Sequence, residues 1–375
     1  MTAIYLDYQA TTPLDPRVLD AMLPWMSRPA NPHATHVFGR AAAEAVESAR
    51  HQVAMLVGAR AEEVYFTGGA TEAANIAIRG LPSGSRVLTS PIEHACVVDT
   101  LAALAGDLEV TIAAVGTDGV IDAGEFSDSI GGHDAAIIMA VNNEVGTVQP
   151  MAEIAAACRL VDAALLTDLS QAAGRIPVEL ADWDVHAGWL SSHKLYGPQG
   201  IGALVWRSAP RPRPILTGGG QERGVRSGTV ATALVVGFGT ACEIAMREMA
   251  IDARHAAALS ARFLDRLRQA HPWLVVNGSL DRRVPQNLSV SFPGIEADAL
   301  VSSLPDLAIS TGSACSAGAI GVSHVLAAMA STEVADGTIR IGFGRPTTIE
   351  EIDGAAAMII RSVTMLTAGA RRKVG

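Results

Sequence analysis

The sequence is poor in aromatic residues, in charged residues and above all in lysine. Aromatic side chains make up 4% of the 375 residues and charged ones 18%, whereas hydrophobic residues reach 49%. A core with so few rings must consist mainly of alanine, valine, leucine and isoleucine. Only two of the 28 basic residues are lysines, Lys194 and Lys373, so arginine carries nearly all of the positive charge. A lysine at the end of an apolar strand therefore needs a chemical reason, because burying its charge is costly.

Other absences narrow the class of protein. The net charge of −10 argues against direct binding to nucleic acid or to anionic membranes. No uncharged run is long enough to span a bilayer, and the first residues lack the basic start of a signal peptide. The four cysteines (Cys96, Cys158, Cys242 and Cys315) are scattered and form no CxxC pair. We therefore expect reduced thiols, no metal site and a cytoplasmic protein.

From about Glu63 onward, short apolar segments alternate with segments of helical periodicity. This alternation predicts an α/β fold with a mostly parallel, seven-stranded sheet. A long helical pattern, from about Ala231 to Ala270 and expected to break near Ile251, leads into shorter α+β segments. We predict a large domain over residues 15–255 and a small domain from residues 1–14 and 256–375. The seven strand candidates are "EVYFT", "SRVLTS", "EVTIAAV", "AAIIMAV", "AALLTD", "HAGWLS" and "GALVWR".

Polar residues follow five of these strands, at the edge where open α/β sheets bind ligands. Two glycines lead into Ala70, Thr71 and Glu72, and such a turn at a helix N-terminus can bind an anion. Each group alone could be a turn or a helix cap, but five convergent strand ends favour a binding site. The other four strands are followed by His94, by Asn143, by Asp168 with Gln171, and by His193 with Lys194.

Lys194 is the residue that needs explaining. Its amine either extends to solvent or works unprotonated. Pyridoxal phosphate requires a lysine for a Schiff base, an acid against its pyridinium nitrogen and a cup for its phosphate. Lys194, Asp168 and the glycine turn supply these three groups, and an imine at Lys194 removes the charge that burial would penalise.

The sequence resembles the NifS/IscS-type cysteine desulfurases of group I, which are fold-type I pyridoxal-phosphate enzymes of the class V aminotransferase family. The resemblance runs nearly from end to end, in the family's order and spacing. The motifs that carry it are "YLDYQATTPLDPRV", "NPHATHVFG", "FTGGATEAAN", "EHACVVDT", "VNNEVGTVQP", "SSHKLYGPQGIGAL", "GGGQERGVRSGT", "STGSACSAG" and "IRIGFGR".

The resemblance implies a role for each candidate residue. Lys194 would hold the cofactor and later move the Cα proton, His94 would stack on the ring and assist proton transfer, and Asp168 would pair with the ring nitrogen. Asn31 and Arg340 would hold the carboxylate of L-cysteine. The remaining cofactor contacts would be Asn143 and Gln171 at the phenolic oxygen, Ala70, Thr71, Ser191 and His193 at the phosphate, and Thr229 at the phosphate of the second subunit in a homodimer.

Cys315 would be the nucleophile, taking sulfur from L-cysteine as a persulfide and leaving alanine. Its setting, "STGSACSAGAIG", is small and glycine-rich, which is typical of a mobile loop, whereas the other cysteines lie in helical patterns and are expected to be inert. The sequence departs from the family in Ser192, which replaces a common glycine, and in a short C-terminal tail. The sulfur-acceptor protein therefore stays open among iron–sulfur assembly, tRNA thiolation and DNA phosphorothioation.

Two rival functions stay open. The chain could be another enzyme of this fold, namely an aminotransferase, a selenocysteine lyase or a sulfinate desulfinase, although Cys315 and its long loop argue against a plain aminotransferase. It could also be a non-catalytic interaction protein, although the joint presence of Lys194, Asp168, His94 and Cys315 argues against that. Yellow colour on purification and alanine release from cysteine distinguish these cases.

Overall fold

A seven-stranded sheet forms the centre of the protein. The computed structural model describes residues 3–311, 323–329 and 336–374. The strand order is β2-β8-β7-β6-β5-β3-β4, and the strands from β7 to β4 are parallel, whereas β8 runs antiparallel to both of its neighbours. The expected mostly parallel seven-stranded sheet is confirmed. Its strands are β2 (Val64–Thr67), β3 (Arg86–Thr89), β4 (Glu109–Ile112), β5 (Ala135–Ile137), β6 (Ala164–Asp168), β7 (Ala187–Ser191) and β8 (Gly202–Trp206).

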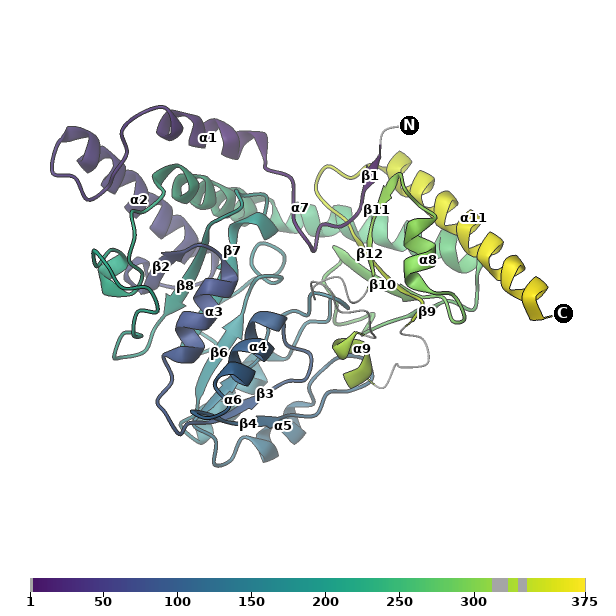
Figure 1. Ribbon diagram of the computed structural model, residues 1–375, viewed down its shortest axis with the longest axis horizontal. Coiled ribbons are helices and arrows are strands. Elements are labelled where there is room, and N and C mark those ends of the chain that lie inside the picture. The colour runs from purple at the N-terminus through teal and green to yellow at the C-terminus, as the bar shows by residue number, and fades with distance from the viewer. Residues whose placement is uncertain (1–2, 312–322, 330–335, 375) are drawn as a thin grey trace.

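Helices cover both faces of this sheet. On one face α3 and α4 pack against strand residues such as Tyr65, Ile137 and Trp189 (Figure 1). On the other face the remaining helices pack against the alternate strand residues, including Phe66 and Leu190. All residues of β7 are buried for this reason, which explains its apolar, non-alternating sequence. The helices are α1 (Pro16–Met26), α2 (Val37–Leu56), α3 (Ala70–Arg79), α4 (Ala95–Ala103), α5 (Ala123–Ser129) and α6 (Met151–Leu160), joined by the first half of α7 (Thr232–Ala270).

A second hydrophobic core lies around a smaller, four-stranded antiparallel sheet. Its strand order is β12-β13-β10-β9, and the second half of α7 packs on it together with α8 and α11 (Figure 1). The N-terminal strand β1 (Ile4–Tyr5) joins this region by parallel pairing with β11 (Leu307–Ala308). The other elements are β9 (Val275–Val276), β10 (Asn287–Ser291), α8 (Ala297–Ser302), β12 (Ser310–Thr311), α9 (His324–Ala328), β13 (Thr338–Gly342) and α11 (Ile349–Val374).

Helix α7 connects the two cores without interruption. Its early residues, such as Phe238 and Ile244, are buried in the first core, and later ones, such as Phe263 and Leu267, in the second. The expected break near Ile251 is wrong. None of residues 246–255 is buried, so the apolar periodicity lapses there, but this stretch contains no glycine or proline that would end a helix. The two cores support the predicted domain limits, which stay a prediction.

In the part of the chain that the structure describes, no helix is both long enough and apolar enough to cross a membrane.

Candidate active site

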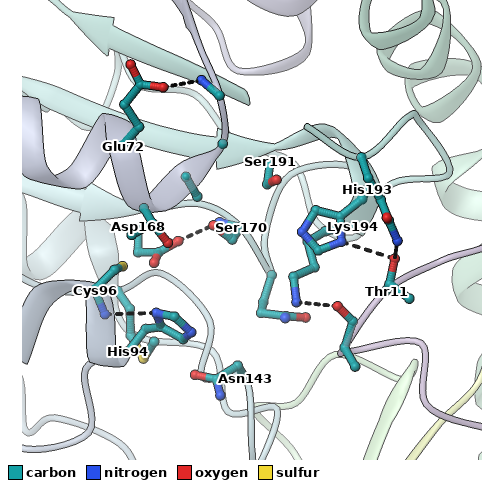
Figure 2. A pocket seen from close by; sticks show the side chains of 18 of the residues that line it. Thr11, Glu72, His94, Cys96, Asn143, Asp168, Ser170, Ser191, His193 and Lys194 are labelled. Carbon is teal, nitrogen blue, oxygen red and sulfur yellow. Dashed lines mark hydrogen bonds between the residues drawn. The ribbon is translucent and has the colours of Figure 1, made fainter. Parts of the chain in front are cut away.

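A cavity of about 710 Å³ opens at the carboxyl ends of the parallel strands, with side chains from the N-terminal segment, α3, α4 and β6 around it (Figure 2). The structure brings together nine of the residues expected in the site. It does so at the sheet edge that ligands favour in open α/β folds. The nine are Ala70, Thr71, His94, Asn143, Asp168, Gln171, Ser191, His193 and Lys194.

Lys194 is the last residue of a single 3-10 turn that directly follows β7. Its Nζ donates hydrogen bonds to two backbone carbonyls, that of Gln9 at 2.5 Å and that of Ala10 at 2.8 Å. The amine is thus held against the N-terminal segment at the rim of the cavity (Figure 2). Of the two alternatives for this lysine, extension to solvent is not what the structure shows.

Asp168 ends β6 and places a carboxylate in the cavity wall. The side chain is buried, and Oδ1 accepts a hydrogen bond of 2.7 Å from the backbone N–H of Ser170. This short turn fixes the carboxylate while leaving it beside the cavity that Lys194 also lines. The arrangement suits an acid that holds a protonated ring nitrogen.

His94 caps helix α4, so it is both a structural and a cavity residue. Its Nδ1 accepts the backbone N–H of Cys96 at 3.1 Å, as Figure 2 shows. An accepting Nδ1 places the hydrogen of the neutral ring on Nε2. The helix cap therefore sets both the orientation and the tautomer of the imidazole.

The preceding residue, Glu93, was not among the expected site residues. Its carboxyl is fully buried, and Oε1 accepts hydrogen bonds from Ser90 Oγ at 2.6 Å and from Met139 N at 2.9 Å. Burial, with a smaller contribution from the charge of Asp168, raises the pKa of Glu93 to about 8. This burial could not be predicted from the sequence, because glutamate side chains are mostly exposed.

The turn between β2 and α3, which the sequence predicts to bind an anion, lies at one end of the cavity. Gly69, with φ of 155°, precedes α3, and no side chain caps that helix end, so its first N–H groups lie beside the cavity. A side chain at Gly202 of β8 would come within 2.7 Å of the backbone of Gly69, so glycine there allows the close approach. Ser191 and Thr71 add hydroxyl groups at the same end.

His193 also lines the cavity. Its Nδ1 is 3.1 Å from Thr11 Oγ1. Burial, and then the positive charge of Lys194, lower the pKa of His193 to about 4. The ring is therefore neutral near pH 7, and its contact with an anion would be a donated N–H rather than a charge interaction.

The expected substrate contacts lie apart from the cavity wall. Arg340, on β13, is buried and donates to the backbone carbonyl of Asn143 at 3.2 Å and to Asp7 Oδ1 at 2.9 Å. It thus reaches the site through Asn143. Asn31 is exposed, and its Oδ1 accepts the backbone N–H of His33. Thr229 is also exposed, and neither of these two lines the cavity.

The described cysteines are buried. Burial raises the pKa of the Cys158 thiol to about 12 and raises those of Cys96 and Cys242 as well, so all three are protonated near pH 7. Cys96 lines the cavity, but as a thiol it is a poor nucleophile. Cys315, the expected nucleophile, lies outside the described residues.

These residues fit pyridoxal phosphate. The cavity joins a lysine amine, a buried carboxylate and an anion-binding turn, which are the three groups that this cofactor requires. Ser170 Oγ, which is buried and has no hydrogen-bond partner among the described residues, also lines the cavity. A polar ligand in the cavity would relieve the cost of burying that hydroxyl.

Comparison with known proteins agrees with this geometry. The chain matches the aminotransferase class-V family over residues 4–354. It is 45% identical over 375 residues to the mitochondrial cysteine desulfurase of Arabidopsis thaliana, covering 97% of this chain and 83% of that protein.

Solved structures give the same result. A NifS-like protein superposes with a TM-score of 0.90 at 32% identity, covering 97% of this chain and 100% of that one. A structure of SspA in complex with cysteine superposes with a TM-score of 0.82 at 34% identity, covering 92% and 100%.

Proposed function

The chain belongs to the cysteine desulfurases of the class-V aminotransferase family, which use pyridoxal phosphate, and we propose that its own Lys194 and Cys315 carry the reaction. Lys194 would hold the cofactor, and Cys315 would receive the sulfur of L-cysteine as a persulfide. One observation supports the assignment of Lys194 above the others. The only lysine besides Lys373 lies with Asp168 and His94 around one cavity, although they are far apart in the sequence.

Each cavity residue has a chemical task in this proposal. The bound cofactor supplies an electron sink for the electrons released at the substrate Cα. Asp168 would hold the proton on the ring nitrogen, and the neutral His193 would donate an N–H to the phosphate. Lys194 carries the Cα proton, because its amine lies at the cavity rim. His94 would offer an Nε2–H rather than an acceptor to the reacting groups, because Nδ1 is engaged in the helix cap.

The substrate carboxylate is assigned to Arg340, with Asn31 as a second contact. Arg340 lies next to Asn143 and is already paired with Asp7, so it is a fixed cation rather than a flexible surface group. A fixed guanidinium binds a carboxylate with two parallel hydrogen bonds at a low entropic cost. The complex of SspA with cysteine supports L-cysteine as the substrate class.

Sulfur transfer would proceed through Cys315. Its thiolate sulfur forms an S–S bond to the substrate sulfur while the substrate's C–S bond breaks, and a returned proton completes alanine. The buried, protonated thiols of the other three cysteines support this assignment by elimination. An acceptor protein then removes the persulfide sulfur.

A homodimer is also proposed, with Thr229 reaching the phosphate of the second subunit. Thr229 is exposed and lies outside its own subunit's cavity wall. Exposed apolar side chains on nearby parts of the chain also support an interface between copies. They are Leu19, Leu23 and Met26 of α1, and Val37 and Phe38 of α2.

The cellular compartment and the sulfur acceptor belong to the same proposal. Reduced cysteines suit the cytoplasm, whereas the Arabidopsis relative is named as a mitochondrial enzyme. Trapping the protein that takes up sulfur from the loaded Cys315 would identify the acceptor.

The decisive experiment follows the lysine and the cysteine separately. The purified protein with pyridoxal phosphate should show the visible absorbance of a lysine-bound cofactor, and borohydride reduction followed by peptide mapping should label Lys194. Lys373→Arg is the matched control, because it removes the other lysine and should leave the label in place. A label on Lys373 alone would contradict the assignment.

Cys315→Ser should bind cofactor like the parent but release no alanine from L-cysteine above background. Cys158→Ala, which changes a buried core thiol, should release alanine at nearly the parent rate. Alanine release by Cys315→Ser at the parent rate would place the nucleophile elsewhere or point to another class-V activity.

A further inference from the structure

Behind the cavity lies a buried arginine, Arg175, to which neither the sequence motifs nor the catalytic scheme assign a task. It is 8% exposed and follows β6 on the same segment as Gln171. One of its terminal nitrogens donates to the side-chain oxygen Oε1 of Gln171, and the other donates to the backbone carbonyl of Tyr8 at 3.1 Å. Both acceptors are neutral oxygens. A buried cation with such partners is costly, so its presence calls for a function.

The contacts of Gln171 determine which way its amide points. A guanidinium can only donate hydrogen bonds, so the atom that faces Arg175 must be the amide oxygen. On its other side, Gln171 Nε2 donates to the backbone carbonyl of Gln9 at 3.1 Å, and a carbonyl can only accept. Rotating the amide by 180° would set N–H against the guanidinium and oxygen against the carbonyl. Both contacts therefore require the same orientation.

This orientation decides what the cavity offers to a ligand. The NH2 group of Gln171 has two hydrogens, one of which is used on Gln9, and Gln171 lines the cavity. The second hydrogen is thus available to an acceptor in the cavity and not to a donor. The backbone carbonyl of Gln9 accepts hydrogen bonds from both Gln171 Nε2 and Lys194 Nζ, so one backbone group holds the amide and the amine.

We propose that Arg175 is a positioning residue that fixes the Gln171 amide with an N–H toward the cavity, where it meets an anionic oxygen of the cofactor ring. The inference rests on the proposed function, because it needs a ring oxygen beside Lys194. Arg175 also places a fixed positive charge behind that oxygen, and both Arg175 and Lys194 line a second, small cavity of about 20 Å³. Burial lowers the pKa of Arg175 to about 10, so the charge is present at neutral pH.

The consequence is a measurable protonation shift. A hydrogen-bond donor and a positive charge beside the ring oxygen both stabilise its anionic form, and so they favour loss of the neighbouring proton on the lysine-bound nitrogen. Without Arg175 the amide can rotate, and the visible band of the bound cofactor should titrate at higher pH. The cofactor should also bind more weakly, because an unfixed amide loses a well-oriented hydrogen bond.

The test is a pH titration of the visible band together with the dissociation constant for pyridoxal phosphate, and it needs no turnover. For Arg175→Met we expect the midpoint to rise by about one pH unit and the dissociation constant to increase about tenfold. Arg175→Lys, which keeps a positive charge, should show the same changes to a smaller extent. Arg283→Met is the matched control. Arg283 is a partly buried arginine that donates to backbone carbonyls, those of Ser279 and Asn277, but lies away from the cavity.

A double-mutant cycle separates positioning from a plain structural role. In a Gln171→Met background the change at Arg175 should move the midpoint clearly less, because the amide is gone and only the direct effect of the charge is left. An equal shift in both backgrounds would overturn the inference, and so would a parent-like midpoint in Arg175→Met. Should Arg175→Met fail to fold, Arg175→Lys measured in both backgrounds decides the question. If the parent itself shows no visible band with pyridoxal phosphate, the proposed function fails and the inference fails with it.

Discussion

At the scale of single residues, hydrogen bonds to backbone groups orient the side chains of the site. His94 Nδ1 accepts the hydrogen bond that caps α4, a backbone turn holds the Asp168 carboxylate, and two backbone carbonyls accept hydrogen bonds from the Lys194 amine. Sequence reasoning found the side chains because each follows a strand. It could not find the carbonyls of Gln9 and Ala10, which lie about 185 positions from Lys194 and have no side-chain signature. At Ser192, which stands where the resembling family commonly has a glycine, the buried Oγ faces the position of Gly197, and the residue does not line the cavity.

The buried carboxyl of Glu93 predicts that the stability of the fold depends on pH. Burial raises its pKa to about 8, above the 4.5 of an ordinary glutamate. The folded state therefore keeps a proton that the unfolded chain releases between these values. The contribution of Glu93 to stability is complete below about pH 4.5 and is lost as the pH rises toward 8, at about 1.4 kcal/mol for each pKa unit.

Glu93→Gln should remove this dependence, because an amide cannot ionise and Oε1 can still accept from Ser90 and Met139. We expect the melting temperature of the variant, measured with cofactor present, to rise relative to that of the parent as the pH increases from 5.5 to 8.5. Glu109→Gln, an exposed change on β4, should show no such trend. Parallel curves for parent and Glu93→Gln would mean that Glu93 is already ionised in the folded protein.

At the scale of elements, hydrophobic pattern predicted most of what the structure contains. All seven strands lie where apolar periodicity placed them, and helices α3, α4 and α6 alternate with them as predicted. The pattern failed at α7, since a helix that leaves one core and enters another has a middle with no buried face. Backbone hydrogen bonds continue through such a stretch although the periodicity lapses. Hydrophobic periodicity indicates which residues are buried, and it predicts a helix only where one face of that helix is buried.

His94 both caps helix α4 and lines the cavity, and two substitutions at this position distinguish the two roles. His94→Asn keeps an acceptor for the Cys96 N–H but removes the imidazole, whereas His94→Ala removes both. We expect His94→Ala to lose about 1 kcal/mol of stability and His94→Asn to lose little. Both variants should lose at least about 100-fold in alanine release if the ring assists proton transfer.

Thermal or urea unfolding and the rate of alanine release are the two measurements. A His94→Asn variant with the parent rate would show that His94 is only a cap. Equal destabilisation by both variants would show that the cap hydrogen bond contributes nothing.

At the scale of the whole molecule, the site joins parts from both cores. Arg340 comes from the small sheet, the carbonyls of Gln9 and Ala10 come from the N-terminal segment, and Lys194 comes from the large sheet. The sequence predicted this assembly only through the family resemblance, because periodicity cannot tell which distant segments meet. It also cannot tell whether a segment such as the one around Thr229 serves its own cavity or that of a second copy.

A subunit-mixing experiment decides which subunit Thr229 serves. Lys194→Ala cannot hold the cofactor, and Thr229→Asp sets a carboxylate against the phosphate, so each homodimer should be inactive. If Thr229 acts across the interface, a mixed dimer has one site with both defects and one site with neither. Equal mixing with free exchange makes half of the dimers mixed, so about a quarter of the parent activity per site should return. If Thr229 instead serves its own subunit, every site keeps one defect and nothing returns, even when exchange is verified with differently tagged subunits. Recovered activity therefore measures the shared site directly. The control is Thr229→Ser, which keeps the hydroxyl and should be active by itself. Its activity would show that the defect of Thr229→Asp comes from the side chain at this position and not from a failure to form dimers.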